Sequence, residues 1–457
     1  MNAPSAFPSP SASLAERLRQ PGHPHSHGRF FVTDIDGVCR GKHLSTDKLA
    51  DMLEGDGTIS SAVFGWDMAD DLYTADVDFA HLQAPLGEVG LRLDAATARQ
   101  IPWDDGRWVV LGEHLAPDGS PLPICPRQVL KGVLQRLNAA GYSAQVGVEF
   151  EWFVLQETEQ SVRAQGFKGL STATQGITNY SPFRIDAQKA FVADLFHWLP
   201  EADIPIEALH TEAGPGNFEA ALRYGEALQS ADRAVLFKQA VREIGRPHGL
   251  LNTFMAKWSM AYGGCGQHMH QSLWRDGRNV FHEAAAGSGA PSKTLRHYIA
   301  GQLHALPHLM ALYAPTVNSY KRLVDGMLAP VHANWAVDDR HASLRVVPGG
   351  AHSQRLETRV PGADANPYLA MAAAIASGLY GIEHQLEPGP ARTASEPGPR
   401  LPRTLEEATD YMAGSALARE LLGGPFIDHF VQTRRWELRR FHSAVTDWEL
   451  ARYLELV

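Results

Sequence analysis

Two short apolar runs that carry charges two residues apart are the most constraining feature of this chain. The first has the sequence VEFEWF and the second has the sequence RLETRV. Because side chains alternate faces along a strand, Glu149 and Glu151 share one face, and Arg355, Glu357 and Arg359 share another. A charge in a core-facing position is costly unless it is paired, hydrogen-bonded or metal-bound. The pattern predicts strands that carry a polar site, and carboxylates with arginines suit one that handles metals and phosphates.

The composition limits the classes of partner. The 457 residues are enough for a large core and more than one domain. A formal net charge of −10 argues against a general binder of nucleic acid or of anionic membranes. No apolar run is long enough to cross a bilayer, and the first 20 residues lack the pattern of an export signal. Three widely spaced cysteines predict a reducing, cytoplasmic setting without disulfides or a zinc site: Cys39, Cys125 and Cys265.

Changes in composition divide the chain into regions. Residues 1–28 are rich in Pro, Ser and Ala and predict a flexible tail. Residues 29–115 alternate short apolar runs with turns, which is typical of a small strand-rich domain. After a linker at 116–127, the segments over 124–457 become longer and amphipathic, with strands between them. This order predicts an α+β fold with an antiparallel sheet.

Periodicity within the larger region predicts individual elements. Helices are expected at 187–199, 229–248 and 295–313, with two or three more over 404–457. Strands are expected at 145–155, 205–222, 265–274, 342–348 and 354–360. A loop rich in Pro and Gly at 387–403 separates the terminal helices from the rest.

Acidic and imidazole side chains recur in four separated segments. The members are Glu149, Glu151, Glu212, Glu219, Glu357, His268 and His270. Two of the glutamates flank a Gly-Pro-Gly turn that can bring them together, and the two histidines lie on one strand face. Carboxylates with few nitrogens and no thiolate favour Mg²⁺ or Mn²⁺ over zinc. A solvated edge or an ion pair explains any one glutamate better, but recurrence in four segments favours a metal site.

Arginines form the complementary set. They are Arg322, Arg340, Arg345, Arg355 and Arg359. The planar guanidinium group suits carboxylate and phosphate oxygens, and metal ions with arginines are what phosphoryl transfer requires. Salt bridges to the acids above are the alternative interpretation. Because the chain has no GxxxxGK[ST] motif and no GxGxxG after a strand, a nucleotide would have to bind in another mode.

Several long blocks of the chain resemble glutamine synthetase, in collinear order over roughly residues 30–457. They include GVEFEWFVL, HTEAGPGNFE, NTFMAKW, GCGQHMHQSLW, APTVNSYKRL and RLETRVPGADANPYLAMAAAIASGLYGIE. Blocks of this length in order are far more specific than a short motif. The resemblance implies a small N-terminal β-grasp domain and a catalytic domain with a curved antiparallel sheet and flanking helices. It also implies a homo-oligomer, commonly a dodecamer of two stacked hexameric rings, with active sites between neighbouring subunits.

The resemblance implies roles for the matching positions. One divalent metal would be held by Glu151, Glu212 and Glu219, and a second by Glu149, His268 and Glu357. The co-substrate ATP would contact His270, Ser272, Arg340, Arg345 and Arg355. L-glutamate would contact Arg322, Arg359 and Gly264, and the catalytic arginines would be Arg340, Arg359 and Arg322. In the family's chemistry the γ-carboxylate of glutamate attacks ATP, and an amine or ammonia then displaces phosphate from the acyl phosphate.

Two segments depart from the ammonia-using enzymes. Those enzymes have a glutamate that helps to bind and deprotonate ammonium, and here Leu328 stands at that position. An apolar residue cannot accept a proton, but it can line a pocket for an organic group. In the N-terminal domain, SAVFGWDMAD replaces the usual Asp-Gly-Ser-Ser. We therefore predict an amine pocket with Leu328, Trp66 and Asp67. The alternatives are a loop shift that brings in Asp325, and ordinary core packing for Trp66.

These observations favour an ATP-dependent ligase that forms a γ-glutamyl amide from L-glutamate and an organic amine. An ordinary glutamine synthetase that uses ammonia at a rearranged site is the first alternative. A catalytically inactive structural or regulatory homologue is the second, and the complete set of six metal-ligand candidates argues against it.

Overall fold

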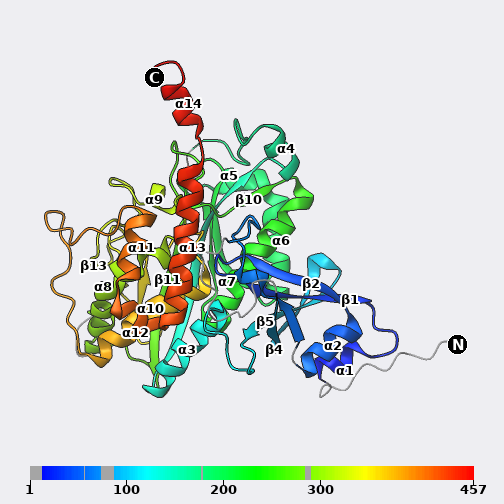
Figure 1. The fold of residues 1–457 in the computed structure, drawn as a ribbon. Helices are drawn as coiled ribbons and strands as arrows, with labels where there is room; N and C mark the ends of the chain where they lie inside the picture. Colours follow the sequence, from blue (N-terminus) through cyan, green and yellow to red (C-terminus); the bar gives the residue numbers. More distant parts are fainter. Residues whose placement is uncertain (1–12, 56, 74–86, 177–178, 284–289) are drawn as a thin grey trace.

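Two β-sheets and a surrounding set of helices build the molecule (Figure 1). The computed structural model describes residues 13–55, 57–73, 87–176, 179–283 and 290–457. Within these ranges the N-terminal sheet has five strands and the larger sheet has ten. All strand pairs of the larger sheet are antiparallel except one at its edge, between β13 and β14. The predicted α+β class with a mainly antiparallel catalytic sheet is confirmed.

The N-terminal sheet has the strand order β2-β1-β5-β4-β3. Its elements are α1 (Leu14–Leu18), β1 (His27–Thr33), β2 (Cys39–Ser45), α2 (Thr46–Glu54), β3 (Gly57–Ser60), β4 (Glu88–Ile101) and β5 (Arg107–Leu115). Alternation along β1 buries Phe30 and Val32 in one core with Leu49 of α2. Ala15 and Leu18 of α1 are buried in the same core, which differs from the flexible tail predicted there.

The larger sheet has the strand order β13-β14-β15-β11-β6-β8-β7, and β9, β10 and β12 pair beside this path. Its strands are β6 (Ser143–Leu155), β7 (Ile206–Thr211), β8 (Asn217–Leu222), β9 (Gly225–Glu226), β10 (Leu251–Thr253), β11 (Gln267–Arg275), β12 (Arg278–Asn279), β13 (Trp335–Val337), β14 (Leu344–Val347) and β15 (Arg355–Thr358). The region predicted as one strand over 205–222 is the hairpin of β7 and β8. Strand β6 lies between β11 and β8, so side chains on one face of β6 have neighbours on both sides.

Helices enclose this sheet (Figure 1). They are α3 (Pro126–Ala139), α4 (Glu159–Ala164), α5 (Pro182–Ile185), α6 (Lys189–Glu201), α7 (Ala227–Gly245), α8 (Lys293–Tyr313), α9 (Ser319–Arg322), α10 (Pro367–Glu383), α11 (Leu405–Ala413), α12 (Ala416–Leu422), α13 (Gly424–Ser443) and α14 (Asp447–Tyr453). Helix α10 is apolar on nearly all sides and buried. It packs closely on α8, because a Cβ atom on Gly301 would lie 2.7 Å from the Cα atom of Gly381. The three internal helices predicted from periodicity are confirmed, whereas the terminal region holds four helices instead of two or three.

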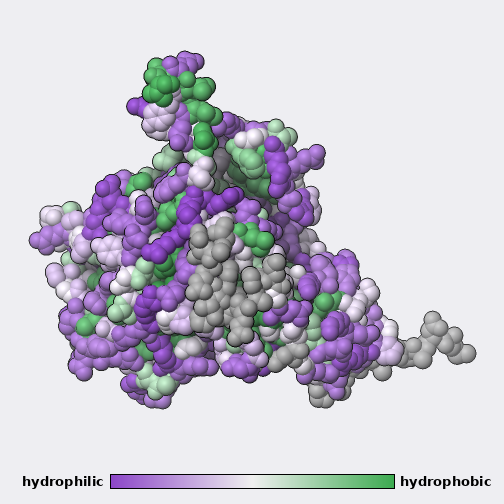
Figure 2. Space-filling view, in the orientation of Figure 1, coloured by the Kyte–Doolittle hydropathy of each residue, from purple (hydrophilic) through white to green (hydrophobic). Residues whose placement is uncertain are grey.

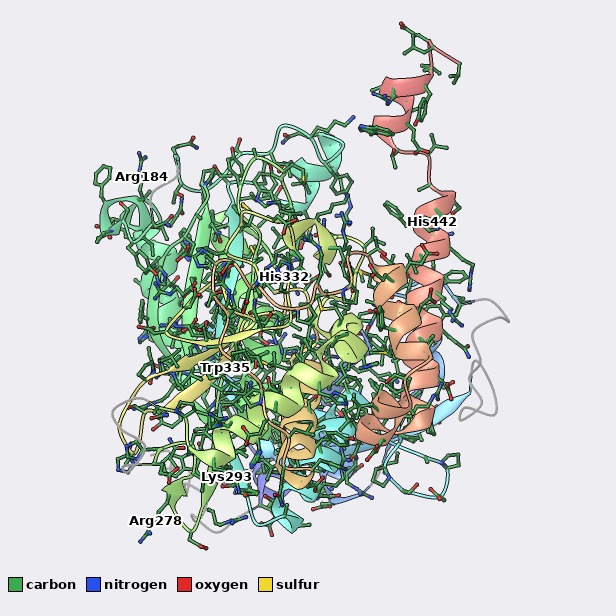
Figure 3. All side chains as sticks on the ribbon, turned by 90° about the vertical axis from the view of Figure 1, so that its left-hand side faces the viewer. Arg184, Arg278, Lys293, His332, Trp335 and His442 are labelled. Atoms are coloured by element: carbon green, nitrogen blue, oxygen red, sulfur yellow. The ribbon has the colours of Figure 1, made fainter. Side chains whose placement is uncertain are left out.

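The C-terminal helices differ in how they meet the body of the molecule. Helix α13 runs along the body, and α14 projects from it (Figure 1). Figure 2 shows apolar side chains gathered on the projecting end, where Trp448, Leu454 and Val457 are exposed. Figure 3 places His442 of α13 and Arg184 of α5 on opposite sides of the molecule. Among the described helices, these included, none is long and apolar enough to cross a membrane.

A buried arginine joins the two sheets. The guanidinium group of Arg127 in α3 donates hydrogen bonds to Asp94 of β4 (2.8 Å), Glu113 of β5 (2.9 Å) and Asp232 of α7 (2.9 and 3.0 Å). Its side chain is 3% exposed, and Tyr368 of α10 also donates to Asp232. Because these carboxylates come from both parts of the chain, Arg127 fixes the N-terminal sheet against the helices that support the larger sheet.

Arg127→Met is expected to lower the free energy of unfolding by about 3 kcal/mol, since it leaves the buried Asp232 without a counterion, whereas Glu113 keeps Lys131. Urea unfolding followed by circular dichroism measures this change. Arg19→Met removes a solvent-exposed arginine from pairs with Asp51 and Glu54 and serves as the control, with almost no effect expected. Equal losses in the two variants would contradict the role of Arg127.

Candidate functional site

Strand pairing places the predicted charged residues on one face of the larger sheet, in neighbouring cross-strand rows that are together called the carboxylate row. Glu149 of β6 lies opposite His268 of β11. On the other side of β6, Glu151 lies opposite Glu219 of β8. Side chains directly opposite each other stand about 4.5–5.5 Å apart at Cβ. The register therefore brings carboxylates that are far apart in the sequence within reach of one cation.

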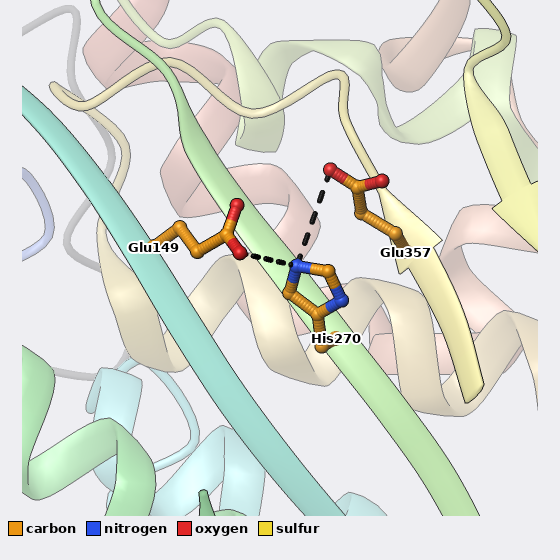
Figure 4. A group of neighbouring side chains, drawn as sticks. All are labelled: Glu149, His270 and Glu357. Atoms are coloured by element: carbon orange, nitrogen blue, oxygen red, sulfur yellow. Dashed lines mark ion pairs between the residues drawn. The ribbon is translucent and has the colours of Figure 1, made fainter. Parts of the chain in front are cut away.

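The first group of candidate ligands comprises Glu149, His270 and Glu357 (Figure 4), whose ligand atoms all lie within 4.8 Å of one another. The Nε2 atom of His270 is 2.9 Å from Oε1 of Glu149 and 4.0 Å from Oε1 of Glu357. The Glu357 side chain is only 1% exposed. Two carboxylates and an imidazole can thus be offered to a single ion.

His268 lies between the two halves of the row. Its Nδ1 atom is 3.6 Å from Glu149 and 3.7 Å from Glu357, and its Nε2 atom is 3.9 Å from Glu151. The structure therefore brings together the predicted set of Glu149, His268 and Glu357. It also brings His270, which the family resemblance assigned to the nucleotide, into the same group.

The second group comprises His210, Glu212 and Glu219, again with ligand atoms within 4.8 Å of one another. The Nε2 atom of His210 is 3.2 Å from Glu212 and 3.6 Å from Glu219. The ring of Tyr180 stacks on His210 with centroids 4.4 Å apart. No role was predicted for His210 from the sequence. Its spacing of two from Glu212 was the available signal, and its pairing opposite Glu219 is what places it in the site.

Glu151 completes the predicted set on this side. Its Oε2 atom accepts a hydrogen bond from the backbone N–H of Gly266 (2.7 Å). Burial, followed by the charges of Glu151 and Glu149, raises the pKa of Glu219 to about 9. A carboxylate crowded by others retains its proton unless a cation replaces it. The donor set, rich in carboxylate oxygen, therefore fits Mg²⁺ or Mn²⁺ at this end of the row.

At the other end of the row, neighbouring side chains stabilise the charged form of the carboxylates. Although burial raises the pKa of Glu149, hydrogen bonds from His268 and His270 outweigh it and hold that pKa well below its usual range. The Glu357 carboxylate accepts hydrogen bonds from Arg345 (3.1 Å) and from Arg359 (2.5 Å). Burial is again outweighed there, chiefly by the charges of His268 and Arg359, and the pKa of Glu357 is lowered. The row is thus electrostatically asymmetric.

Arg322 is held rigidly beside this row. It is 4% exposed, and it donates hydrogen bonds to the carbonyl oxygens of Val360 (2.9 Å) and Arg359 (3.2 Å). A Cβ atom on Gly264 would lie 2.6 Å from Cγ of Arg322, so only glycine fits there. Burial lowers the pKa of Arg322. Its guanidinium group is thus positioned before any ligand binds, next to the predicted glutamate contact at Gly264.

A cavity of about 260 Å³ opens beside the first ligand group. Its walls include Glu149, Tyr224, His270, Ser272, Trp274, His352 and Arg355. Arg355 donates a hydrogen bond to Nδ1 of His270 (3.0 Å), and Trp274 stacks on His352 with centroids 6.1 Å apart. The cavity thus unites three of the residues predicted to contact ATP, which are His270, Ser272 and Arg355. Arg345 reaches Glu357 instead of lining the cavity, and Arg340 is exposed between β13 and β14.

The loop at the predicted amine position is apolar and exposed. Leu328 is 55% exposed, and the preceding Met327 is 40% exposed. Both oxygens of Asp325 accept hydrogen bonds from Arg400, at 3.0 and 2.8 Å. The Asp325 carboxylate therefore has a partner, and the loop offers apolar surface beside it.

The N-terminal loop with Trp66 and Asp67 is held against α13. Asp67 is 8% exposed and accepts hydrogen bonds from the indole of Trp436 (2.9 Å) and from two backbone N–H groups of its own loop. The guanidinium group of Arg40 lies over the Trp66 ring. Among the described residues, no hydrogen bond, ion pair or ring contact joins Trp66 or Asp67 to Leu328, and the predicted amine pocket stays a prediction.

One family model and three known proteins resemble this chain over most of its length. The model described as the catalytic domain of glutamine synthetase matches residues 123–453. Type-1 glutamine synthetase 2 of Dictyostelium discoideum is 40% identical over 435 residues, covering 93% of this chain and 83% of that protein. The glutamate–isopropylamine ligase of a Pseudomonas species is 33% identical over 436 residues, covering 94% and 95%. A solved structure of GmaS without ligand has a TM-score of 0.84 at 27% identity, covering 97% and 99%.

Glu219→Gln is expected to stabilise the metal-free protein at alkaline pH. Because the folded state raises this pKa from 4.5 to about 9, the folded protein holds the proton more tightly than the unfolded chain does. The native protein therefore loses stability as the pH rises between these values, and the variant loses less. Thermal unfolding in EDTA should give the variant the higher midpoint at pH 8.5 and a smaller advantage near pH 5.

With saturating Mn²⁺ the native protein should have the higher unfolding midpoint, because bound metal stabilises it more than it stabilises the Glu219→Gln variant. Glu207→Gln, at an exposed position on β7, is the matched control and should show neither effect. A Glu219→Gln variant that is less stable than the native protein in EDTA at pH 8.5 would contradict the raised pKa.

Proposed function

The chain belongs to the glutamine synthetase family, and from this premise we propose that it joins the γ-carboxyl group of L-glutamate to an organic amine. ATP would supply the energy through a γ-glutamyl phosphate intermediate. The observation that carries the choice of amine is the exposed Leu328, preceded by exposed Met327, at the position of the ammonium-binding glutamate. Such a loop suits an amine with an organic body better than it suits a small cation.

We assign phosphoryl transfer to the carboxylate row and the cavity beside it. Divalent cations at the row would neutralise phosphate oxygens and align the γ-phosphate. Arg345 and Arg355 stand on the adjacent strands β14 and β15, next to Glu357 and His270 respectively. Guanidinium groups fixed there can stabilise charge that develops on the transferred group. Arg340, which is exposed, would approach the phosphates from the solvent side.

We assign the carboxylates of glutamate to Arg322, Arg359 and the backbone at Gly264. Main-chain carbonyl groups already orient Arg322, and Glu357 orients Arg359. A clamp that is ordered before binding loses little side-chain entropy when the substrate arrives. Holding the γ-carboxylate in line with the phosphate would then supply much of the rate enhancement.

The environment of the loop supports a substrate that is neutral and partly apolar when it attacks. The pairing of Asp325 with Arg400 leaves that carboxylate engaged, so it is poorly placed to hold an ammonium ion. Leu328 cannot accept a proton. An alkyl or aromatic group on the amine would instead cover the apolar side chains and gain affinity from their burial.

We further propose a homo-oligomer of stacked rings in which neighbouring chains complete the active sites. The apolar side chains exposed on α14 support this, because a second chain would cover them. In a single chain the Trp66 loop and the Leu328 loop have no described contact, which is expected if they meet across a subunit boundary.

A glutamine synthetase that uses ammonia is the second candidate, and the 40% identity to the Dictyostelium enzyme favours it. The apolar loop argues against it. An inactive homologue is a weaker third candidate, because all six predicted metal ligands are present and converge on one sheet face.

The proposal is tested by measuring phosphate release with glutamate, ATP and Mg²⁺ while the amine is varied. The panel should contain ammonia, isopropylamine, ethanolamine, a polyamine and an aromatic amine. We expect at least one organic amine to exceed ammonia in kcat/KM by about tenfold or more, a difference of about 1.4 kcal/mol in transition-state binding. Ammonia outperforming every organic amine would contradict the proposal.

Leu328→Glu is expected to shift the ratio of kcat/KM for ammonia over the best organic amine upward by about tenfold, because it restores a carboxylate for the ammonium ion. Ala164→Glu places the same charge at an exposed position on α4 and is the control. A ratio that is the same in Leu328→Glu and in the control would mean that this loop does not set specificity.

A further inference from the structure

A second cavity, of about 480 Å³, lies between the two sheets and the terminal helix α13. Its walls come from the β1–β2 turn, the Met68 loop, α7, the segment after β10, residues 315–321 and α13. None of its lining residues belongs to the carboxylate row or to the nucleotide cavity. Its volume falls within the range of small-molecule sites, about 300–1,000 Å³.

Three cationic side chains face this cavity. Lys238 and Arg242 are one turn apart on α7, and Lys321 lies on α9. In the part of the chain that the structure describes, no carboxylate oxygen lies within 4.0 Å of a side-chain nitrogen of these three residues, so none of them forms an ion pair. Lys238 donates hydrogen bonds to the carbonyl oxygens of Ala363 (2.8 Å) and Ala365 (3.5 Å), which carry no full charge. Burial lowers the pKa of Lys238 to about 7, so the lasting positive charges are those of Arg242 and Lys321, which have no ion-pair partner among the described residues.

The carboxyl groups in the same walls do not offset these cations. Asp36 is paired with Arg434 at 2.5 Å. Asp364 accepts hydrogen bonds from the hydroxyl groups of Ser319 (2.5 Å) and Thr316 (3.0 Å), but burial outweighs them and raises its pKa, which favours its neutral form. Burial raises the pKa of Glu437, which favours its neutral form. The charge balance of the cavity therefore favours an anion.

The rest of the lining is apolar. Met68, Met255 and Phe441 line it with exposed side chains, whereas Phe254 is only 3% exposed. The Nζ atom of Lys238 lies 5.6 Å from the centroid of Phe254, and the guanidinium carbon of Arg242 lies 5.4 Å from it. The Phe254 ring thus supports the cations, and the exposed thioethers and the Phe441 ring offer a surface on which an apolar body can lie.

We propose that this cavity binds a small organic anion, with a carboxylate or phosphate group on an apolar body, at a site separate from the active site. Anionic oxygens would meet Arg242 and Lys321, and the body would pack on Met68, Met255 and Phe441. Each guanidinium or ammonium contact made in a recess shielded from water is stronger than the same contact at an open surface.

The cavity also adjoins the segment that carries Arg322, and a regulatory role is proposed for it through that segment. Lys321 directly precedes Arg322, the residue assigned to glutamate. The Asn318 side chain of the same segment accepts a hydrogen bond from the backbone of Lys257 at 2.8 Å and donates one to it at 2.7 Å. An anion that draws Lys321 toward the cavity would therefore move the Arg322 segment and change the KM for glutamate. This kinetic consequence rests on the proposed function, whereas the binding itself does not.

Calorimetric titration with benzoate and with phenyl phosphate tests the proposal, and benzyl alcohol serves as the neutral probe with the same ring. The full chain is kept in saturating ADP, Mg²⁺ and glutamate so that anions cannot report on the active site. We expect one of the two anions to bind with Kd below about 1 mM and benzyl alcohol not to bind measurably. The anion that binds identifies the head group as carboxylate or phosphate.

Arg242→Gln and Lys321→Met should each weaken binding by about tenfold or more, because each removes a charge-assisted contact. Lys48→Met, at an exposed position on α2, is the matched control and should bind as the native protein does. Failure of both anions to bind, or equal affinity in Arg242→Gln and in the control, would overturn the site. Binding without any change in the KM for glutamate would overturn its regulatory role alone. Neither binding result depends on turnover, so the site can fail without the ligase activity failing.

Discussion

Mutual repulsion among carboxylates on one face of the larger sheet is the constraint on which the rest of the structure depends. Two like charges 4 Å apart repel by about 4 kcal/mol at an effective dielectric constant of 20. The protein compensates for this repulsion in different ways at the two ends of the row. Arg345, Arg359 and two imidazoles neutralise the end at Glu357, while the end at Glu219 retains a proton in the absence of metal. We propose that divalent cations complete this arrangement and that the need for them is greatest beside Glu219.

The surrounding fold keeps the row from relaxing this repulsion by moving apart. Strand β6 has hydrogen-bonded neighbours on both sides, so the backbone that carries its two glutamates cannot move without breaking the sheet. Arg127 ties the supporting helices to the N-terminal sheet, and main-chain carbonyls hold Arg322 before substrate arrives. The binding groups are thus oriented in advance, which is what in-line transfer of a phosphoryl group to a bound acid requires.

Local patterns in the sequence predicted the parts of this arrangement that depend on local rules. Alternation placed Glu149 and Glu151 on one strand face, and helical periodicity found α6, α7 and α8. Resemblance to a family then related the separated blocks to one site. The sequence could not predict that His210 meets Glu219, because that contact depends on the register of the β7–β8 hairpin. It also could not predict that Asp67 is held by Trp436, 369 residues away in the chain. Such contacts are set by tertiary packing, which local propensity does not contain.

The central claim is that one sheet face forms two distinct cation positions, one at each end of a row of carboxylates. The most direct test is to count bound Mn²⁺ per chain in the presence of ADP, from the electron paramagnetic resonance signal of the free ion. The account predicts two Mn²⁺ in the native protein, one in Glu149→Gln, one in Glu212→Gln, and none in the double variant. A native protein that binds fewer than two, or a single variant that loses both, would contradict it.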